Sequence, residues 1–173
     1  MLEPNKVEVW YSSNYALNFD ARLRECVTWR CKGICVPSSY MYDTKAYAHM
    51  KSAKVLHGVD VVVAVGLQLG TSAFAAKVAE IVECNKELVS AVDVVLNHDW
   101  IYNGNWKAVR EEIIQISLNC SVDIRWAINM ELFGECTMLR VADMVMERGG
   151  DIKLGTEYDR YLGGQHVEVL RRQ

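Results

Sequence analysis

The feature of this sequence that most constrains its fold is a regular alternation between short β-branched runs and longer segments with helical periodicity. Successive runs begin 26 to 32 residues apart, which leaves room for one crossover helix between each pair. This spacing is typical of parallel βα units, either in an open doubly wound sheet or in a (β/α) barrel. The six runs are Lys6–Tyr11, Gly33–Val36, Val59–Val65, Ala91–Asn97, Asp123–Asn129 and Asp151–Leu154.

Length and charge narrow the classes of function. At 173 residues the chain has the size of a single domain, residues 1–173, and 51% hydrophobic residues suffice for a sizeable core. The net charge of −3 gives no broad basic surface, so we expect neither nucleic acid nor a membrane as partner. There is no signal-peptide pattern and no apolar run of the ~18 residues that a membrane span requires. A cytoplasmic protein is therefore expected, although a processed organellar protein would look similar.

The six cysteines are expected to be reduced thiols, because they lie in apolar, periodic segments and not in a loop-rich framework. Cys26, Cys31 and Cys35 are close in sequence, but their spacing matches no structural zinc pattern and no histidine completes a cluster. We expect neither a metal site nor a cofactor.

The segments between the runs carry helix signals. Asp43 can cap a helix that ends at Gly58, and Thr71 or Ser72 opens the next. The tail 159–172 has a weaker helical pattern. The residues predicted to form apolar helix faces are Ala46, Met50 and Ala53, then Phe74, Val78, Ile81 and Val82, then Trp106, Val109, Ile113 and Ile116, and last Leu139, Ala142 and Met146.

Four motifs, in order and at fitting distances, cover roughly residues 33 to 156. The stretch Val63-Ala64-Val65-Gly66-Leu67-Gln68-Leu69-Gly70, followed by Lys77 and Glu80, resembles the third strand and following helix of deoxyribose-phosphate aldolases, V-I-G-F-P-x-G and K-x-x-E. Ile34-Cys35-Val36 is similar to the second strand, Val92-Asp93-Val94-Val95 to the fourth, and Lys153-Leu154-Gly155-Thr156 to the K-T-S-T-G of the sixth. The resemblance implies an α/β fold of the TIM-barrel type and a class I aldolase site.

The resemblance places the Schiff-base lysine of the family at Lys153 and its strand-four aspartate at Asp93. A neutral amine adds to an aldehyde and forms an imine that accepts electrons during carbon–carbon cleavage, and Asp93 would help to move protons. The alternatives without a catalytic role are that Lys153 is a strand-end lysine that reaches water and that Asp93 belongs to a structural ion pair. A carboxylate among β-branched residues needs a partner, and Lys153 is the expected one if both side chains point inward.

Four further residues are candidates for substrate binding. Cys35 matches a family cysteine near the substrate, although a strand cysteine is often only a small buried hydrophobe. Asn97 has the strand parity of Asp93 and is either a ligand or a satisfied core residue. Asn129 stands where the family has a glutamate, and Thr156 is the one retained hydroxyl of the sixth-strand motif.

The chain also departs from the family. A complete barrel of this type needs eight strands and about 250 residues, so this chain has room for about six βα units and lacks strands seven and eight. In the family, strands seven and eight carry a second lysine, which lowers the pKa of the nucleophile, and a phosphate-binding loop region. Neither can be assigned in this sequence. Arg125, which shares parity with Asn129, is the candidate replacement for that cation.

Two main readings of the function follow. The first is cleavage of 2-deoxy-D-ribose 5-phosphate to acetaldehyde and glyceraldehyde 3-phosphate through an imine on Lys153; a variant of it uses a small unphosphorylated aldehyde. The second is a catalytically degenerate aldolase-like subunit with a structural role in a larger assembly. Both predict a protein partner or a homo-oligomer, because an incomplete barrel exposes the edges of its first and sixth strands.

Overall fold

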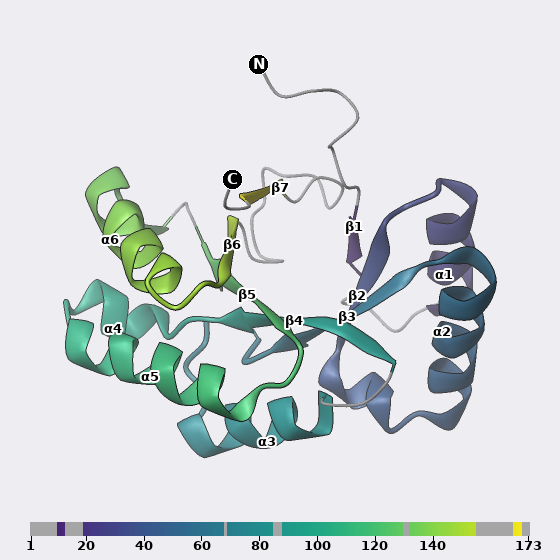
Figure 1. Cartoon of the computed structure of the whole chain (residues 1–173), viewed down its shortest axis with the longest axis horizontal. Helices are drawn as coiled ribbons and strands as arrows, with labels where there is room; N and C mark the ends of the chain where they lie inside the picture. Colours follow the sequence, from purple (N-terminus) through teal and green to yellow (C-terminus); the bar gives the residue numbers. More distant parts are fainter. Residues whose placement is uncertain are drawn as a thin grey trace.

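The protein forms a curved sheet of six parallel strands with one antiparallel strand added at the end (Figure 1). The computed structural model describes residues 10–12, 19–67, 69–84, 88–129, 132–154 and 168–170. The strand order follows the chain order, so each strand pairs with the next. The strands are β1 (Trp10–Ser12), β2 (Gly33–Pro37), β3 (Asp60–Val65), β4 (Val89–Val95), β5 (Asp123–Ile128), β6 (Asp151–Leu154) and β7 (Glu168–Leu170).

Helices lie along the outer side of this sheet and leave its concave side to the strands alone (Figure 1). This is the layering of a (β/α) barrel that stops before it closes. The helices are α1 (Phe19–Thr28), the 3-10 helix η2 (Ser38–Met41), α2 (Thr44–His57), α3 (Phe74–Cys84), α4 (His98–Tyr102), α5 (Trp106–Asn119) and α6 (Glu135–Met146).

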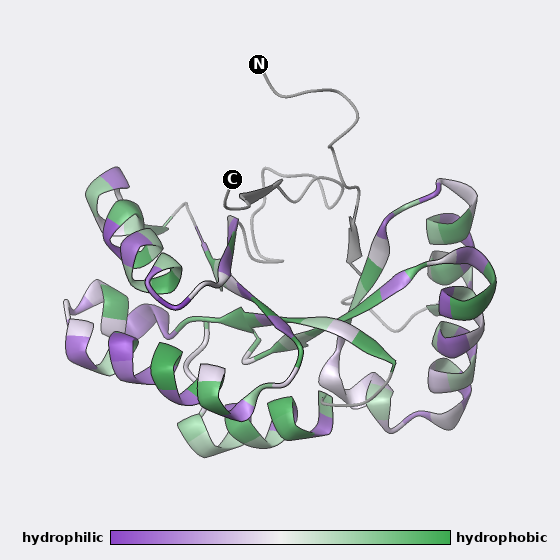
Figure 2. Ribbon diagram, in the orientation of Figure 1, coloured by the Kyte–Doolittle hydropathy of each residue, from purple (hydrophilic) through white to green (hydrophobic). Residues whose placement is uncertain are grey.

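The two faces of the sheet differ in side-chain size. Outward strand residues such as Val63, Val94 and Trp126 join the helices in the main hydrophobic core. The hydropathy colouring shows hydrophobic residues in the central strands and a mixture of hydrophobic and hydrophilic residues along the helices (Figure 2). The inner face carries a small separate apolar cluster of Cys35, Val62, Ala64 and Ala91. Small inner residues leave space for longer polar side chains near the barrel axis.

Five of the predicted strands are confirmed, and none of their ends is shifted by more than two residues. Of the first predicted strand, Lys6–Tyr11, only Trp10 and Tyr11 lie within the described residues, and both belong to β1. The predicted helix after Asp43 is confirmed as well. Asp43 Oδ1 accepts hydrogen bonds from the N–H groups of Lys45 and Ala46 at 2.9 and 3.0 Å, and Gly58 ends α2 with φ 68°.

Two predicted helix faces are only partly right, since Ile81 of α3 is buried and Ala142 of α6 packs against the core, but other members are not. In α3 the buried residues are Lys77, Ile81 and Cys84, whereas Phe74 and Val82 are exposed. In α6 the core face consists of Val141, Met144 and Val145, whereas Leu139 and Met146 are exposed. The three residues of the α2 face are buried as predicted, and so are Val109, Ile113 and Ile116 of α5.

The C-terminal end differs from the prediction in a way that changes the sheet edge. Residues Glu168–Leu170, expected in a weak helix, form β7 and pair antiparallel with β6, with Lys153 opposite Val169. The edge of β6 is therefore covered, and the end strands of the sheet are β1 and β7. Among the described residues, no helix is long and apolar enough to cross a membrane.

Candidate active site

The inner face of the sheet brings one carboxylate together with three donors. Asp93 Oδ2 accepts hydrogen bonds from Lys153 Nζ at 2.8 Å and from Cys35 Sγ at 3.4 Å, and Asp93 Oδ1 accepts one from Arg125 Nε at 2.6 Å. Asp93 is only 1% exposed and Lys153 only 5%, so both charges are removed from water. The donors come from β6, β2 and β5, and the carboxylate comes from β4.

Strand register explains this convergence. Asp93 pairs with Ala64 on one side and with Arg125 on the other, and Ala127 pairs with Lys153. Arg125 and Ala127 are two residues apart, so these positions all face the inner side of the sheet. Because Ala64 and Ala91 are small, the long side chains of Arg125 and Lys153 can reach Asp93 across the concave face.

The charges at this site set each other's ionisation. Burial alone lowers the pKa of Lys153, but the negative charge of Asp93 outweighs burial and holds that pKa above its usual value. Burial raises the pKa of Asp93, and the positive charges of Lys153 and Arg125 outweigh it and hold the pKa below its usual range. At neutral pH the resting site therefore contains an ammonium, a guanidinium and a carboxylate.

The other predicted binding residues lie elsewhere. Asn97 is buried, but its side-chain oxygen accepts from Trp100 N–H at 3.1 Å and caps α4. Asn129 is buried just after β5, and its N–H donates to His98 Nε2 at 3.1 Å. Thr156 lies outside the described residues. The substrate-binding roles of Asn97, Asn129 and Thr156 stay predictions.

His98 and Asp99 both belong to α4, a short helix that the sequence did not predict. The His98 ring stacks on Phe133 with centroids 5.4 Å apart, and burial lowers the pKa of the ring. A neutral imidazole that accepts a backbone N–H at Nε2 serves to fix the loop after β5.

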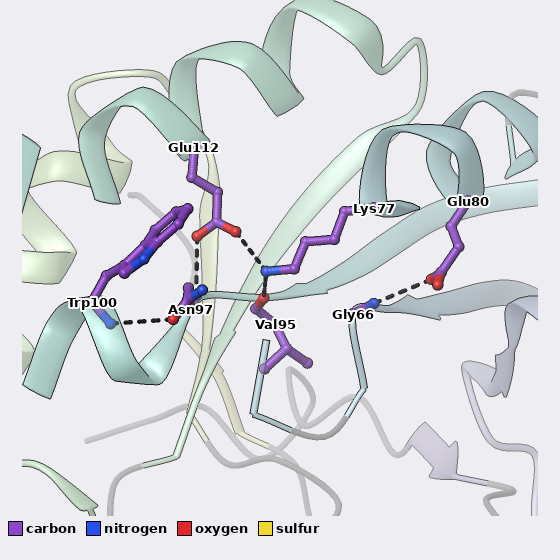
Figure 3. A network of polar contacts seen from close by, with 7 residues as sticks. All are labelled: Gly66, Lys77, Glu80, Val95, Asn97, Trp100 and Glu112. Carbon is purple, nitrogen blue, oxygen red and sulfur yellow. Dashed lines mark hydrogen bonds and ion pairs between the residues drawn. The ribbon is translucent and has the colours of Figure 1, made fainter. Parts of the chain in front are cut away.

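A second buried charge cluster was missed by the sequence interpretation (Figure 3). Lys77 of α3 and Glu112 of α5 form an ion pair, with Nζ and Oε1 2.5 Å apart and both side chains buried. Lys77 Nζ also donates to Val95 O at 2.9 Å, and Glu112 Oε2 accepts from Asn97 N–H at 3.0 Å. The signal was present, since Lys77 precedes Ile81 by four residues and Glu112 falls between Val109 and Ile113 on a core stripe.

In the described part of the chain, no group of three or more histidine, cysteine or acidic side chains is placed to hold a metal ion. The cysteines among these residues are free thiols. The chemistry available on the inner face is that of a lysine amine, a carboxylate, a guanidinium and a thiol.

Fold and site together define the class: a (β/α) barrel of the TIM type, incomplete, with a buried lysine–aspartate pair on the inner side of its strands. Comparison with known proteins gives the relationship. The chain is a shortened homologue of the deoxyribose-phosphate aldolases. It is 34% identical over 126 residues to the deoxyribose-phosphate aldolase of Desulfitobacterium hafniense, an alignment that covers 69% of this chain and 57% of that protein.

Solved structures agree on the fold. The aldolase QR15 superposes with a TM-score of 0.73 at 17% identity and covers 89% of this chain and 68% of its own. The tetrameric deoxyribose phosphate aldolase from Aeropyrum pernix superposes with a TM-score of 0.68 at 18% identity, over 89% and 63% of the two chains. No family model matches the sequence. The chain thus spans a little over half the length of the curated relative from Desulfitobacterium hafniense.

Proposed function

We propose that the protein is an aldolase that cleaves 2-deoxy-D-ribose 5-phosphate through an imine on Lys153. The observation that carries this proposal is the buried Lys153 amine, 2.8 Å from the Asp93 carboxylate on the inner face of the sheet. The homology to deoxyribose-phosphate aldolases supports it. The inner cluster also holds two cations against one anion, and this excess of positive charge favours an anionic, phosphorylated substrate.

The first step of this reaction requires the ammonium of Lys153 to lose its proton. Asp93 is the acceptor in contact with it, and the neutral amine then adds to the aldehyde carbon of the open-chain sugar. Loss of water gives the iminium. A base, for which Asp93 is the available carboxylate once it has given up the lysine proton, then takes the proton of the C3 hydroxyl as the bond between C2 and C3 breaks. The electrons of that bond flow into the iminium, which releases glyceraldehyde 3-phosphate and leaves an enamine. Protonation at C2 and hydrolysis return acetaldehyde and the free amine.

Arg125 tunes the nucleophile in this scheme. Its positive charge lowers the pKa of Lys153 and so opposes the effect of Asp93. Arg125 would thereby act as the cation that lowers the pKa of the nucleophile. Cys35, which contacts the same oxygen of Asp93 as Lys153 does, lies where it would border the bound aldehyde.

Reduction with borohydride tests the proposal directly. In the presence of 2-deoxy-D-ribose 5-phosphate, the wild-type protein should gain a covalent two-carbon or five-carbon adduct on the tryptic peptide that contains Lys153. The matched control is Lys153→Arg, which keeps a cation beside Asp93 but cannot form an imine. A well-folded wild-type protein with no adduct on Lys153 would exclude the aldolase mechanism.

A second candidate function is that of an aldolase-like subunit with a structural role. It is favoured by the charge state of the site, because Asp93 holds Lys153 as an ammonium, the form that cannot attack an aldehyde. In this case the ion pairs of Asp93 only join β4, β5 and β6. The same reduction experiment separates the two functions. The neighbour from Aeropyrum pernix is tetrameric, which supports assembly with further copies under either proposal.

A further inference from the structure

The C-terminal end of β4 is held in an unusual way. Leu96 N–H donates to Ala127 O of β5 at 3.1 Å, and backbone groups of alternate strand residues point to opposite neighbours. The backbone groups of Val95 and Asn97 therefore point toward β3. The ladder between β3 and β4 ends at the pair Val65–Val94, and the chain turns at Gly66 with φ 70°.

Lys77 and Glu112 occupy the place that β3 leaves (Figure 3). Lys77 Nζ donates to Val95 O, and Glu112 Oε2 accepts from Asn97 N–H, at 2.9 and 3.0 Å. If β3 continued for one more residue as a parallel strand, the N–H of that residue would donate to Val95 O and its C=O would accept from Asn97 N–H. The ion pair thus replaces a rung of the sheet with two charge-assisted hydrogen bonds, which are stronger than neutral ones.

The turn after β3 is shaped around this pair. A Cβ atom on Gly66 would lie 2.7 Å from Lys77 Cε, so the glycine leaves room for the lysine side chain. Gly66 N–H donates to Glu80 Oε2 at 3.2 Å, one helical turn from Lys77 (Figure 3). A Cβ atom on Gly70 would lie 2.1 Å from Leu96 O, so the returning loop packs directly on the end of β4.

We propose that Lys77 and Glu112 are positioning residues that fix the end of β4 and thereby hold Asp93 in line with Lys153. Asp93 lies two residues before Val95, and a strand fixed at Val95 and Asn97 cannot tilt or slide at Asp93. A proton acceptor must stay within a few tenths of an ångström of its working position, because small displacements reduce rates strongly. The catalytic consequence rests on the proposed aldolase function, whereas the placement of Asp93 does not.

The test uses variants of the whole chain. The double variant Lys77→Met/Glu112→Leu removes both charges and avoids an unpaired buried one. Glu112→Gln is the milder variant and retains an acceptor for Asn97. The control is Ile116→Ala, which removes a buried side chain from the same helix and keeps both charges of the Lys77–Glu112 pair. Two quantities are measured: the 13Cγ chemical shift of Asp93 in protein labelled with 13C-aspartate, assigned from Asp93→Asn, and kcat and KM for sugar-phosphate cleavage.

We expect the double variant to move the Asp93 signal and to lower kcat about tenfold or more with little change in KM. Glu112→Gln should give a smaller effect of the same kind. Ile116→Ala should lower the unfolding midpoint and leave the Asp93 signal in place. The inference is overturned if the Asp93 signal stays at its wild-type position in both the double variant and Glu112→Gln. It is also overturned if Ile116→Ala moves the signal by the same amount. If the wild-type protein neither cleaves the sugar nor forms an adduct, the aldolase proposal fails and the Asp93 signal alone decides the positioning role.

Discussion

At the scale of single residues, Asp93 is the centre of the charge network on the inner face of the sheet. Two buried cations, Arg125 and Lys153, form ion pairs with this one carboxylate, and both are at most 5% exposed to water. A buried ion-pair network of this kind seldom stabilises a fold more than an apolar core would. Removal of one member, however, leaves the remaining buried charges uncompensated. The inner face is therefore much more sensitive to the loss of Asp93 than to the loss of either cation.

Asp93→Asn should lower the free energy of unfolding by about 3–5 kcal/mol at neutral pH, because Arg125 and Lys153 lose their counter-charge. Arg125→Met, which leaves the Asp93–Lys153 pair intact, should cost clearly less. Since the pKa of Asp93 is lowered in the folded protein, its contribution is present above the unfolded value near 3.8 and is lost as the pH falls through the folded value. Urea unfolding at several pH values checks both points. Equal losses for the two variants would show that Asp93 is not the centre of the network.

The pH dependence of imine formation should shift in opposite directions in these two variants. Imine formation needs the neutral amine, and Asp93 raises the pKa of Lys153, so the wild-type rate should rise with pH well into the alkaline range. Arg125→Met removes a charge that lowers this pKa and should move the profile to higher pH. Asp93→Asn should move it to lower pH. Initial rates of borohydride-trapped adduct at a series of pH values measure the shifts, and profiles that coincide would contradict the proposed electrostatics.

At the scale of elements, Gly70 in the turn between β3 and α3 and Gly58 at the end of α2 offer a matched pair of substitutions. Gly58 and Gly70 both have φ 68°, so alanine at either position meets the same left-handed backbone cost of about 1–2 kcal/mol. At Gly58 a Cβ atom would meet nothing within 4 Å, whereas at Gly70 it would lie 2.1 Å from Leu96 O. Gly70→Ala should therefore cost several kcal/mol more than Gly58→Ala. Thermal unfolding of the two variants checks this, and similar losses would mean that the loop does not press on β4.

The same elements show what the sequence could predict. The strands were found because β-branched runs recur at regular spacing, and α2 because Asp43 and Gly58 mark its ends with side-chain and backbone chemistry that acts locally. The burial of Lys77 on the core face of α3 was not predicted, because this residue is charged. Its burial depends on Glu112, which lies 35 residues further along the chain. α4 was not predicted, since its five residues are too few to show helical periodicity.

The candidate site was predictable only in part, for a related reason. The resemblance placed Lys153 and Asp93 in the site, and strand parity allowed both to point inward. The contact of Cys35 with the same carboxylate follows from the register between β2, β3 and β4, which no single run of sequence contains. Asn97 shares the parity of Asp93, but the chain leaves β4 after Val95, so parity no longer decides where its side chain lies.

At the scale of the whole molecule, the sheet formed by the described strands is curved as in a barrel and has β1 and β7 at its two ends. β7 covers β6 with only three residue pairs, and β1 contributes three residues at the opposite end. Short end strands limit uncontrolled pairing, yet their outer backbone groups still offer a template for another strand. The concave face that holds Asp93 and Lys153 lies between these edges, so a body that bridges them would also enclose the site and exclude water from it.

We therefore expect the protein to associate, with itself or with a chain that supplies further strands. Sedimentation velocity over a wide range of concentrations should show a species heavier than the 19.6 kDa of one chain. If association encloses the site, the yield of borohydride-trapped adduct per chain should rise with protein concentration in step with the heavier species, because a dry site strengthens the interactions that stabilise the iminium. Lys153→Arg controls for assembly, since it should associate normally without forming the adduct. A species of one chain at every concentration, with a constant adduct yield, would show that the open sheet functions without a partner.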